Sequence, residues 1–373
     1  MQAFFDAAKN GDIEQLRQFI NDHVYLDDQD NNGNTAFILA LENGNTECAQ
    51  LLLDANANVE ADSGRRDIAL ISAVRKGKID CLQLLIRARA NLDAPDASGD
   101  TALMWAAREG RIDCAQRLVD AQADVNANYW TRDTALIYAT REGKNICTKL
   151  LVDAKANLDI RDRHGITALM WAMTSDSTDY AQLLVDAKVD VNAGDDCGKT
   201  PLAWAACYGQ VEYAQLLITA NAGVNMKDNS DGTTPLLEAA THGQNACMQL
   251  LVESKAIIDA VNNNGTTALM RAAERGHTEC VRLLVAAKAD VEAEDNSGKT
   301  ALLWAARASS AECVQLLVEA NAFLDDEDEN GNTALMLAAN SGNRGCVRMI
   351  LGLATKLFSV VTLKKPKSVQ GRN

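Results

Sequence analysis

Hydrophobic and polar positions follow a pattern that returns every 33 residues along the chain. The run TALMWAA at 101–107 recurs as TALMWAM at 167–173 and as TPLAWAA at 200–206. Most runs are followed by a glycine such as Gly110, where a positive φ would end a helix. A second apolar stripe comes next, for example CAQRLV at 114–119, with the spacing of one buried helix face. The pattern predicts a helix, a tight turn, a second helix and a loop in every repeat.

Ten repeats can be aligned on the small residue that follows a threonine or its equivalent, and an earlier one starts near Ala3. The aligned residues are Ala36, Ala69, Ala102, Ala135, Ala168, Pro201, Pro235, Ala268, Ala301 and Ala334. Each step is 33 residues except the one ending at Pro235, where the loop at 228–232 carries one more. Because 33 residues cannot close a core alone, about eleven repeats must bury their apolar faces on one another.

The predicted fold is therefore an all-α solenoid of helix-turn-helix-loop repeats with short, hairpin-like loop tips. We expect one continuous array over residues 1–354, with an N-terminal cap near 1–32 and a C-terminal cap near 331–354. Residues 355–373 have no counterpart in the other repeats and are expected to form a basic, disordered tail.

The repeats resemble ankyrin repeats, whose signature is a Thr-Pro-Leu-His-x-Ala run in 33 residues. The resemblance covers roughly residues 2–354. Two departures from the family pattern stand out. The histidine of the signature is replaced, for example by Met104 and Met270, so a hydrogen bond usual in the family should be missing. The glycine that ends the second helix is replaced by residues less suited to αL geometry, which predicts weaker caps: Asn56, Arg89, Gln122, Lys155, Lys188, Asn221, Lys255, Lys288 and Asn321.

Eight of the ten cysteines occupy one position of the repeat. Equivalent points on stacked helices lie roughly 8–10 Å apart, beyond the reach of a disulfide. We interpret these cysteines as small buried hydrophobic residues. Cys197 and Cys207 lie off the pattern and are the two candidates for a reactive thiol.

The net charge is −15, and because the last 22 residues carry five basic groups and no acid, the residues before them carry −20. Such a surface repels nucleic acid and anionic membranes, and a charged partner of this chain would have a basic contact face. The alternative is that the acidity only keeps the array soluble. No run of about 18 uncharged apolar residues and no signal peptide is found. We expect a cytoplasmic monomer, with a weak nuclear signal at 364–367 as an alternative.

Catalytic chemistry, cofactors and metal sites are not predicted. The segments at 28–33 and 326–331 match the opening of a calcium loop, but the required glutamate is replaced by Leu39 and Leu337. The four histidines lie in different repeats without ligand spacing. No phosphate loop, nucleophile elbow or CxxC motif is present.

One position of the first helix points away from the small-residue face and is aromatic in four successive repeats, and an arginine often follows three residues later within stacking distance. In the ankyrin family this side of the first helix and the loop tips line a concave partner-binding surface, which the resemblance implies here too. Aromatic residues and arginines are enriched at such interfaces. The candidate protein-binding residues are Trp105, Arg108, Tyr129, Trp130, Tyr138, Arg141, Trp171, Trp204, Tyr208, Trp304 and Arg307.

Partial burial between adjacent first helices is the alternative role of the tryptophans. The leading functional prediction is a non-catalytic scaffold or adaptor that binds other proteins. A regulatory inhibitor that masks a basic face of an enzyme or factor is the alternative. A part of a larger enzyme or ubiquitin-ligase adaptor is disfavoured, because we expect no further domain in the tail.

Overall fold

The computed structural model describes residues 1–60, 69–174 and 178–362, with side chains in the last helix described as far as Thr355. Within these ranges it contains 22 helices and no strand, which confirms the all-helical prediction. The chain divides into two compact parts, an N-terminal region (Met1–Asp190) and a C-terminal region (Val191–Asn373). The single continuous array over residues 1–354 stays a prediction.

The helices alternate between a first and a second helix of each repeat. In the N-terminal region the first helices are α1 (Gln2–Asn10), α3 (Ala36–Asn43), α5 (Ala69–Arg75), α7 (Ala102–Glu109), α9 (Ala135–Arg141) and α11 (Ala168–Ala172). The second helices there are α2 (Ile13–Asn21), α4 (Thr46–Asp54), α6 (Ile79–Arg87), α8 (Ile112–Asp120), α10 (Asn145–Asp153) and α12 (Asp179–Asp186).

The C-terminal region continues the same alternation. Its first helices are α13 (Pro201–Tyr208), α15 (Pro235–His242), α17 (Ala268–Arg275), α19 (Ala301–Arg307) and α21 (Ala334–Asn340). Its second helices are α14 (Val211–Thr219), α16 (Asn245–Glu253), α18 (Thr278–Ala286), α20 (Ala311–Glu319) and α22 (Arg344–Thr362).

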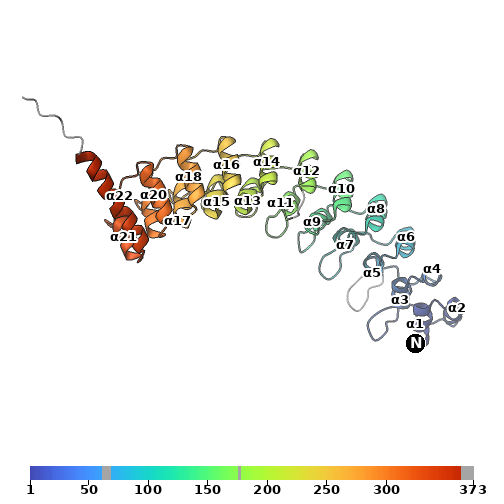
Figure 1. Ribbon diagram of the computed structural model, residues 1–373. Coiled ribbons are helices and arrows are strands. Elements are labelled where there is room, and N and C mark those ends of the chain that lie inside the picture. Colours follow the sequence, from blue (N-terminus) through green and yellow to red (C-terminus); the bar gives the residue numbers. More distant parts are fainter. Residues whose placement is uncertain (61–68, 175–177, 363–373) are drawn as a thin grey trace, which may run out of the picture. The chain divides into compact units, whose positions relative to one another are not determined.

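Within each region every first helix packs on the next first helix, as α7 does on α9 and α13 on α15. Figure 1 shows that in the N-terminal region these helices lie between the second helices and the loops. The close approach is possible because small side chains such as Ala106 and Ala107 are completely buried on the packed face. The core of each region is therefore an apolar layer made by neighbouring repeats.

Threonine starts most first helices. The hydroxyl of Thr101 accepts a hydrogen bond from the backbone N–H of Met104 at 3.3 Å, which satisfies one donor of the first turn. The expected loss of the family histidine is partly compensated, because the Met104 sulfur accepts from the Thr101 N–H at 3.3 Å. Met270 and Thr267 repeat this arrangement at 3.4 Å.

The second helices end at residues with left-handed backbone geometry. All nine substitutes for the family glycine have positive φ, for example 62° at Lys155 and 69° at Asn56. The next N–H, that of Ala57, bonds the Leu52 carbonyl at 2.9 Å, which is the Schellman pattern of helix termination. The helix caps are therefore formed in spite of unfavourable residue types.

The loop tips are closed by a backbone hydrogen bond across four residues, such as Asp96 N–H to Asp100 carbonyl at 3.0 Å. Three tips also carry an isolated antiparallel bridge, among them the pair Arg161 and Thr167. These features agree with the predicted hairpin-like tips.

The eight cysteines of the repeat position are buried and free of disulfides, as predicted. Burial raises the pKa of the Cys247 thiol to about 11, so the group stays protonated at neutral pH. Cys197 is exposed and Cys207 is half-buried.

The last helix extends the predicted array. The expected disordered tail at 355–373 is instead helical as far as Thr362, because α22 runs without interruption from Arg344. Residues 363–373, with the basic cluster at 364–367, lie outside the described residues.

Candidate protein-binding surface

A single aspartate connects each tryptophan of the first helices to the loop tip before it. In the third loop tip, one oxygen of Asp96 accepts the backbone N–H groups of Ser98 and Asp100 at 2.8 and 3.0 Å. The other oxygen accepts the indole N–H of Trp105 at 2.8 Å. Asp96 is buried, so these charge-assisted bonds fix both the tip and the ring.

The same arrangement occurs at every tryptophan of the first helices, always with a separation of nine residues. The indole N–H groups of Trp171, Trp204 and Trp304 donate to aspartate oxygens at 3.0, 3.0 and 2.9 Å. The acceptors are Asp162, Asp195 and Asp295. All four tryptophans are half-buried.

Hydrogen bonds at the last of these tips also control the ionisation of Asp295. Burial acts to raise the pKa of Asp295, but bonds from Ser297, Lys299 and the Trp304 indole outweigh it and hold that pKa below its ordinary value. The carboxylate is therefore charged at neutral pH, as the indole donor requires.

In the N-terminal region, arginines and aromatic rings alternate across four neighbouring first helices, α5, α7, α9 and α11. The guanidinium carbon of Arg75 lies 4.6 Å from the centre of the Trp105 ring, and that of Arg108 lies 5.1 Å from it. Arg108 also lies 5.5 Å from the centre of the Tyr138 ring, on the next helix.

The alternation continues with Arg141, whose guanidinium carbon lies 4.8 Å from the Tyr138 ring centre and 5.4 Å from that of Trp171. We call these six residues the cation–π ladder: Arg75, Trp105, Arg108, Tyr138, Arg141 and Trp171. The predicted stacking of Arg108 on Trp105 and Arg141 on Tyr138 is confirmed, and the contacts between repeats extend it. Arg75 was not predicted as a member.

Tyr138 differs from the exposed ring that its position predicted. Only 4% of it is exposed, and its hydroxyl donates to the buried Asp100 carboxylate at 2.7 Å. The ring is covered because two arginines lie over it and its hydroxyl turns inward. Tyr138 therefore supports the ladder instead of offering a contact surface of its own.

Tyr129 and Trp130 form an exposed aromatic pair on the loop tip that precedes α9, with Trp130 69% exposed. The Tyr129 hydroxyl donates to the Asp93 carbonyl of the preceding loop at 2.8 Å. Trp130 packs over Gly99, where an added Cβ would lie 2.7 Å from a ring carbon. Arg132 has the positive φ of the turn glycine that it replaces, 58°. The pair is thus held against the neighbouring tip while most of the indole faces solvent.

In the C-terminal region, the candidate aromatic residues form two separate groups. Trp204 stacks on Tyr208 with ring centres 5.5 Å apart, and Tyr208 is 63% exposed. Trp304 lies between two cations, with Lys299 and Arg307 at 5.5 and 5.3 Å from its ring centre. The predicted stacking of Arg307 on Trp304 is confirmed.

Charged residues occupy the ring position in the two helices between these groups. Glu238 of α15 pairs with Lys199 at 2.9 Å, and Arg271 of α17 pairs with Glu274 at 2.9 Å. Glu238 also lies 3.4 Å from the ring of His242, which in turn lies 3.7 Å from the Cys207 sulfur. Cys207, Glu238 and His242 therefore lie close together in the structure. The sequence analysis did not predict this group, because the four histidines lie in different repeats. The i,i+4 spacing of Glu238 and His242 was the one available signal.

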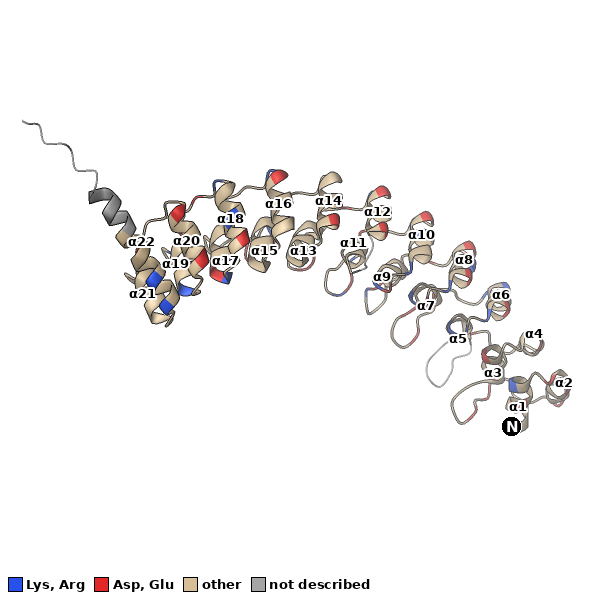
Figure 2. Ribbon diagram, in the orientation of Figure 1, with Lys and Arg blue, Asp and Glu red and all other residues tan. Residues whose placement is uncertain are grey.

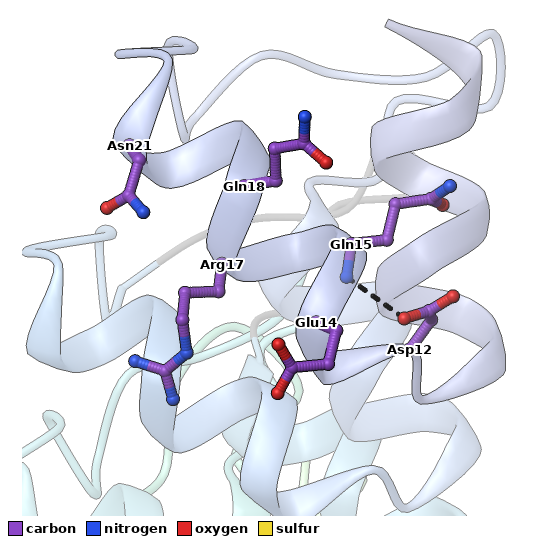
Figure 3. A pocket seen from close by; sticks show the side chains of 6 residues that line it. All are labelled: Asp12, Glu14, Gln15, Arg17, Gln18 and Asn21. Atoms are coloured by element: carbon purple, nitrogen blue, oxygen red, sulfur yellow. Dashed lines mark hydrogen bonds between the residues drawn. The ribbon is translucent and has the colours of Figure 1, made fainter.

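Two surface depressions lie away from the candidate residues. One, of about 490 Å³, is an open hollow on α2. Figure 3 shows the polar side chains that line it, with Asp12 accepting the backbone N–H of Gln15. These side chains give the first repeat a polar outer face. The other, of about 470 Å³, lies at the start of α22 around Val347.

Figure 2 shows acidic residues on the second helices α8, α10 and α12 of the N-terminal region. The loops carry others, such as Asp93, Asp96 and Asp100. None of the helices in the described ranges is both long and apolar enough to cross a bilayer.

Comparison with known families identifies the repeat. A family model for ankyrin repeats in three copies matches residues 4–96, 58–129, 128–195, 202–295 and 287–358. A search of curated proteins gives no significant match.

Proposed function

Since the chain belongs to the ankyrin repeat family, whose repeats mediate protein–protein interactions, we propose that it is a non-catalytic scaffold or adaptor that binds partner proteins. The proposed contact surface is formed by the first helices and the loop tips. Its candidate residues are the exposed Tyr129 and Trp130, the ladder residues other than the buried Tyr138, and the groups around Trp204 and Trp304. Fold alone does not select a partner, so the proposal rests on these side chains.

The exposed Tyr129–Trp130 pair is the observation that carries the proposal. An indole that is 69% exposed offers a large apolar surface whose burial by a partner would favour binding. The contact of Trp130 with Gly99 and the hydrogen bond of Tyr129 to Asp93 restrict the motion of the pair before any partner arrives, which lowers the entropy lost on binding. Large, preorganised aromatic side chains of this kind are typical interface hot spots.

The test uses the unaltered chain and a double variant, Tyr129→Ala and Trp130→Ala, to capture binding proteins from cell extract. The affinity of both forms for one captured protein is then measured. Loss of a hot spot of about 2 kcal/mol predicts about 30-fold weaker binding. The melting temperature should change little, because Trp130 is mostly exposed. Ile146→Ala is the matched control, since Ile146 is 60% exposed on a second helix. Unchanged binding in the double variant would refute the role of the pair.

The alternative function, an inhibitor that masks a basic face of an enzyme or factor, is supported by the net charge of −15. Salt separates the two proposals, because charge-dominated binding weakens steeply with ionic strength whereas an aromatic contact largely persists. Capture that survives a high-salt wash but is lost in the Tyr129/Trp130 variant supports the scaffold. Capture that is lost in high salt and unaffected by the variant supports the inhibitor.

The remaining features of the proposal follow from composition. A partner with a basic contact surface fits the acidic chain, whereas nucleic acid and anionic membranes do not. We propose a cytoplasmic, monomeric protein without a cofactor requirement for partner binding.

A further inference from the structure

Three side chains with metal-binding chemistry meet between α13 and α15. Cys207 lies near the end of α13, and Glu238 and His242 are one turn apart on α15. These two helices pack directly on each other. One potential ligand atom from each of the three side chains lies within 4.8 Å of the other two.

The histidine ring is oriented by its own helix. Its Nδ1 atom lies 3.0 Å from the Glu238 backbone carbonyl, a group that can only accept, so Nδ1 carries the proton in the neutral ring. The Nε2 atom then presents its lone pair, and it lies 3.7 Å from the Cys207 sulfur. Metal-binding histidines have the same arrangement, with one nitrogen donating to a carbonyl and the other directed to the ion.

The separation of sulfur and nitrogen matches a tetrahedral site. With Zn–S near 2.3 Å and Zn–N near 2.05 Å, a tetrahedral angle places the two ligand atoms about 3.6 Å apart. The observed separation is 3.7 Å. We propose that Cys207, Glu238 and His242 form a binding site for a thiophilic divalent cation of the Zn²⁺ class. One or more water molecules would complete its coordination.

Lys199 is the competing cation. Its ammonium nitrogen lies 2.9 Å from one oxygen of Glu238 and 5.2 Å from the centre of the Trp204 ring. The divalent ion replaces this ion pair at the carboxylate, and the lysine side chain is long enough to swing towards solvent. On binding, the thiol releases its proton to water as the metal–sulfur bond forms. A thiolate and a carboxylate then neutralise the double positive charge.

Exposure of the ligands is consistent with entry of an ion from solvent. The His242 side chain is 44% exposed and that of Glu238 is 12% exposed. Cys207 is half-buried, unlike the eight cysteines of the repeat position, which are buried.

The experiment titrates the full chain with CoCl₂ under reducing conditions and records the cobalt d–d and thiolate-to-cobalt charge-transfer bands, with ZnCl₂ as the competitor. We expect one ion to bind with a charge-transfer band that Zn²⁺ abolishes. Cys207→Ser should remove the band, and His242→Asn should weaken binding at least about tenfold. Lys199→Met should strengthen binding severalfold, because it removes the competing ammonium.

Matched variants test the location. Cys197→Ser removes the other off-pattern thiol, which is exposed on a loop tip, and His164→Asn removes a histidine from another repeat. Both should bind as the unaltered chain does. His242 lies at the surface, so its variant folds even if Cys207→Ser does not. Unaltered binding in His242→Asn, absence of a charge-transfer band in the original chain, or loss of the band in Cys197→Ser would each overturn the proposal.

Discussion

The N-terminal and C-terminal regions use the same outward position of the first helix for different chemistry. In α7, α9 and α11 it is Trp105, Tyr138 and Trp171, and arginines fill the spaces between the rings. In α15 and α17 it is Glu238 and Arg271, which form ion pairs with nearby side chains. Because the backbone repeats unchanged, a single position decides whether neighbouring helices share a cation–π contact or a charged cluster.

The two regions share the hydrogen-bonded aspartate of the loop tip, which we call the common frame, and they differ in the cations around the rings. The aspartate that fixes the loop tip is present beside tryptophans of both regions, as Asp96 and Asp295. The cations differ, since Arg108 contacts rings on two helices whereas Arg307 lies over one. The N-terminal region thus couples adjacent repeats through cation–π contacts, whereas the repeats of α13 and α15 in the C-terminal region are coupled by the Lys199–Glu238 ion pair.

The largest effect is expected from breaking the common frame. Asp96→Ala removes an acceptor of three hydrogen bonds and should lower the free energy of unfolding by about 2–4 kcal/mol. Asp295→Ala should cost a similar amount in the C-terminal region, because the same tip bonds and indole bond are lost. Urea unfolding measures both, and Asp153→Ala, an exposed residue, is the control. Widely different losses would show that the frame is not common to the two regions.

Tyr138→Phe tests the buried end of the ladder. Loss of the hydroxyl leaves the Asp100 carboxylate with one partner fewer and should lower the free energy of unfolding by about 1–3 kcal/mol. Burial raises the pKa of Asp100, and the Tyr138 hydrogen bond opposes that rise, so the variant should raise this pKa further.

The pH dependence of this variant has a definite sign. A raised pKa in the folded state means that stability is retained at pH below the unfolded value and lost as pH rises through the folded value. The loss caused by Tyr138→Phe should therefore be larger at pH 7 than near pH 4. Tyr25→Phe is the control, since Tyr25 is 69% exposed. Equal losses at both pH values would contradict the assigned bond.

The smallest effect concerns the cations of the two regions. Arg108→Met should lower the free energy of unfolding by about 1 kcal/mol, because two ring contacts of a partly exposed cation are lost. Arg307→Met should cost about half as much, because only one ring contact is lost. Thermal unfolding of the two variants in parallel provides the measurement. A loss at Arg307 that equals or exceeds the loss at Arg108 would remove the distinction between the regions.

Much of the fold could be predicted from the sequence because each repeat contains the same local signals. The helix pairs, the buried cysteines and the stacking within one helix, such as Arg141 on Tyr138, depend on residues close in the chain. Their geometry follows from helical periodicity alone.

Other features of the candidate sites could not be predicted. Arg75 joins Trp105 and Arg108 joins Tyr138 across a helix interface, so these contacts depend on the register between neighbouring repeats. Tyr138 was predicted as an exposed ring by its position on the helix, but the inward bond to Asp100 buries it. Helical spacing gives the direction of a side chain from its own axis and does not show what the next repeat places over it.

The sequence by itself determined the period, the two helices of each repeat and the residues that each helix buries, because these follow from local propensity and apolar spacing. Only the tertiary structure decided which surface side chains meet. Cys207 and His242 are 35 positions apart in the sequence, and their 3.7 Å contact exists because α13 packs on α15 in one particular register. That register is set by all the contacts between the two packed helices, so it cannot be read from either helix alone.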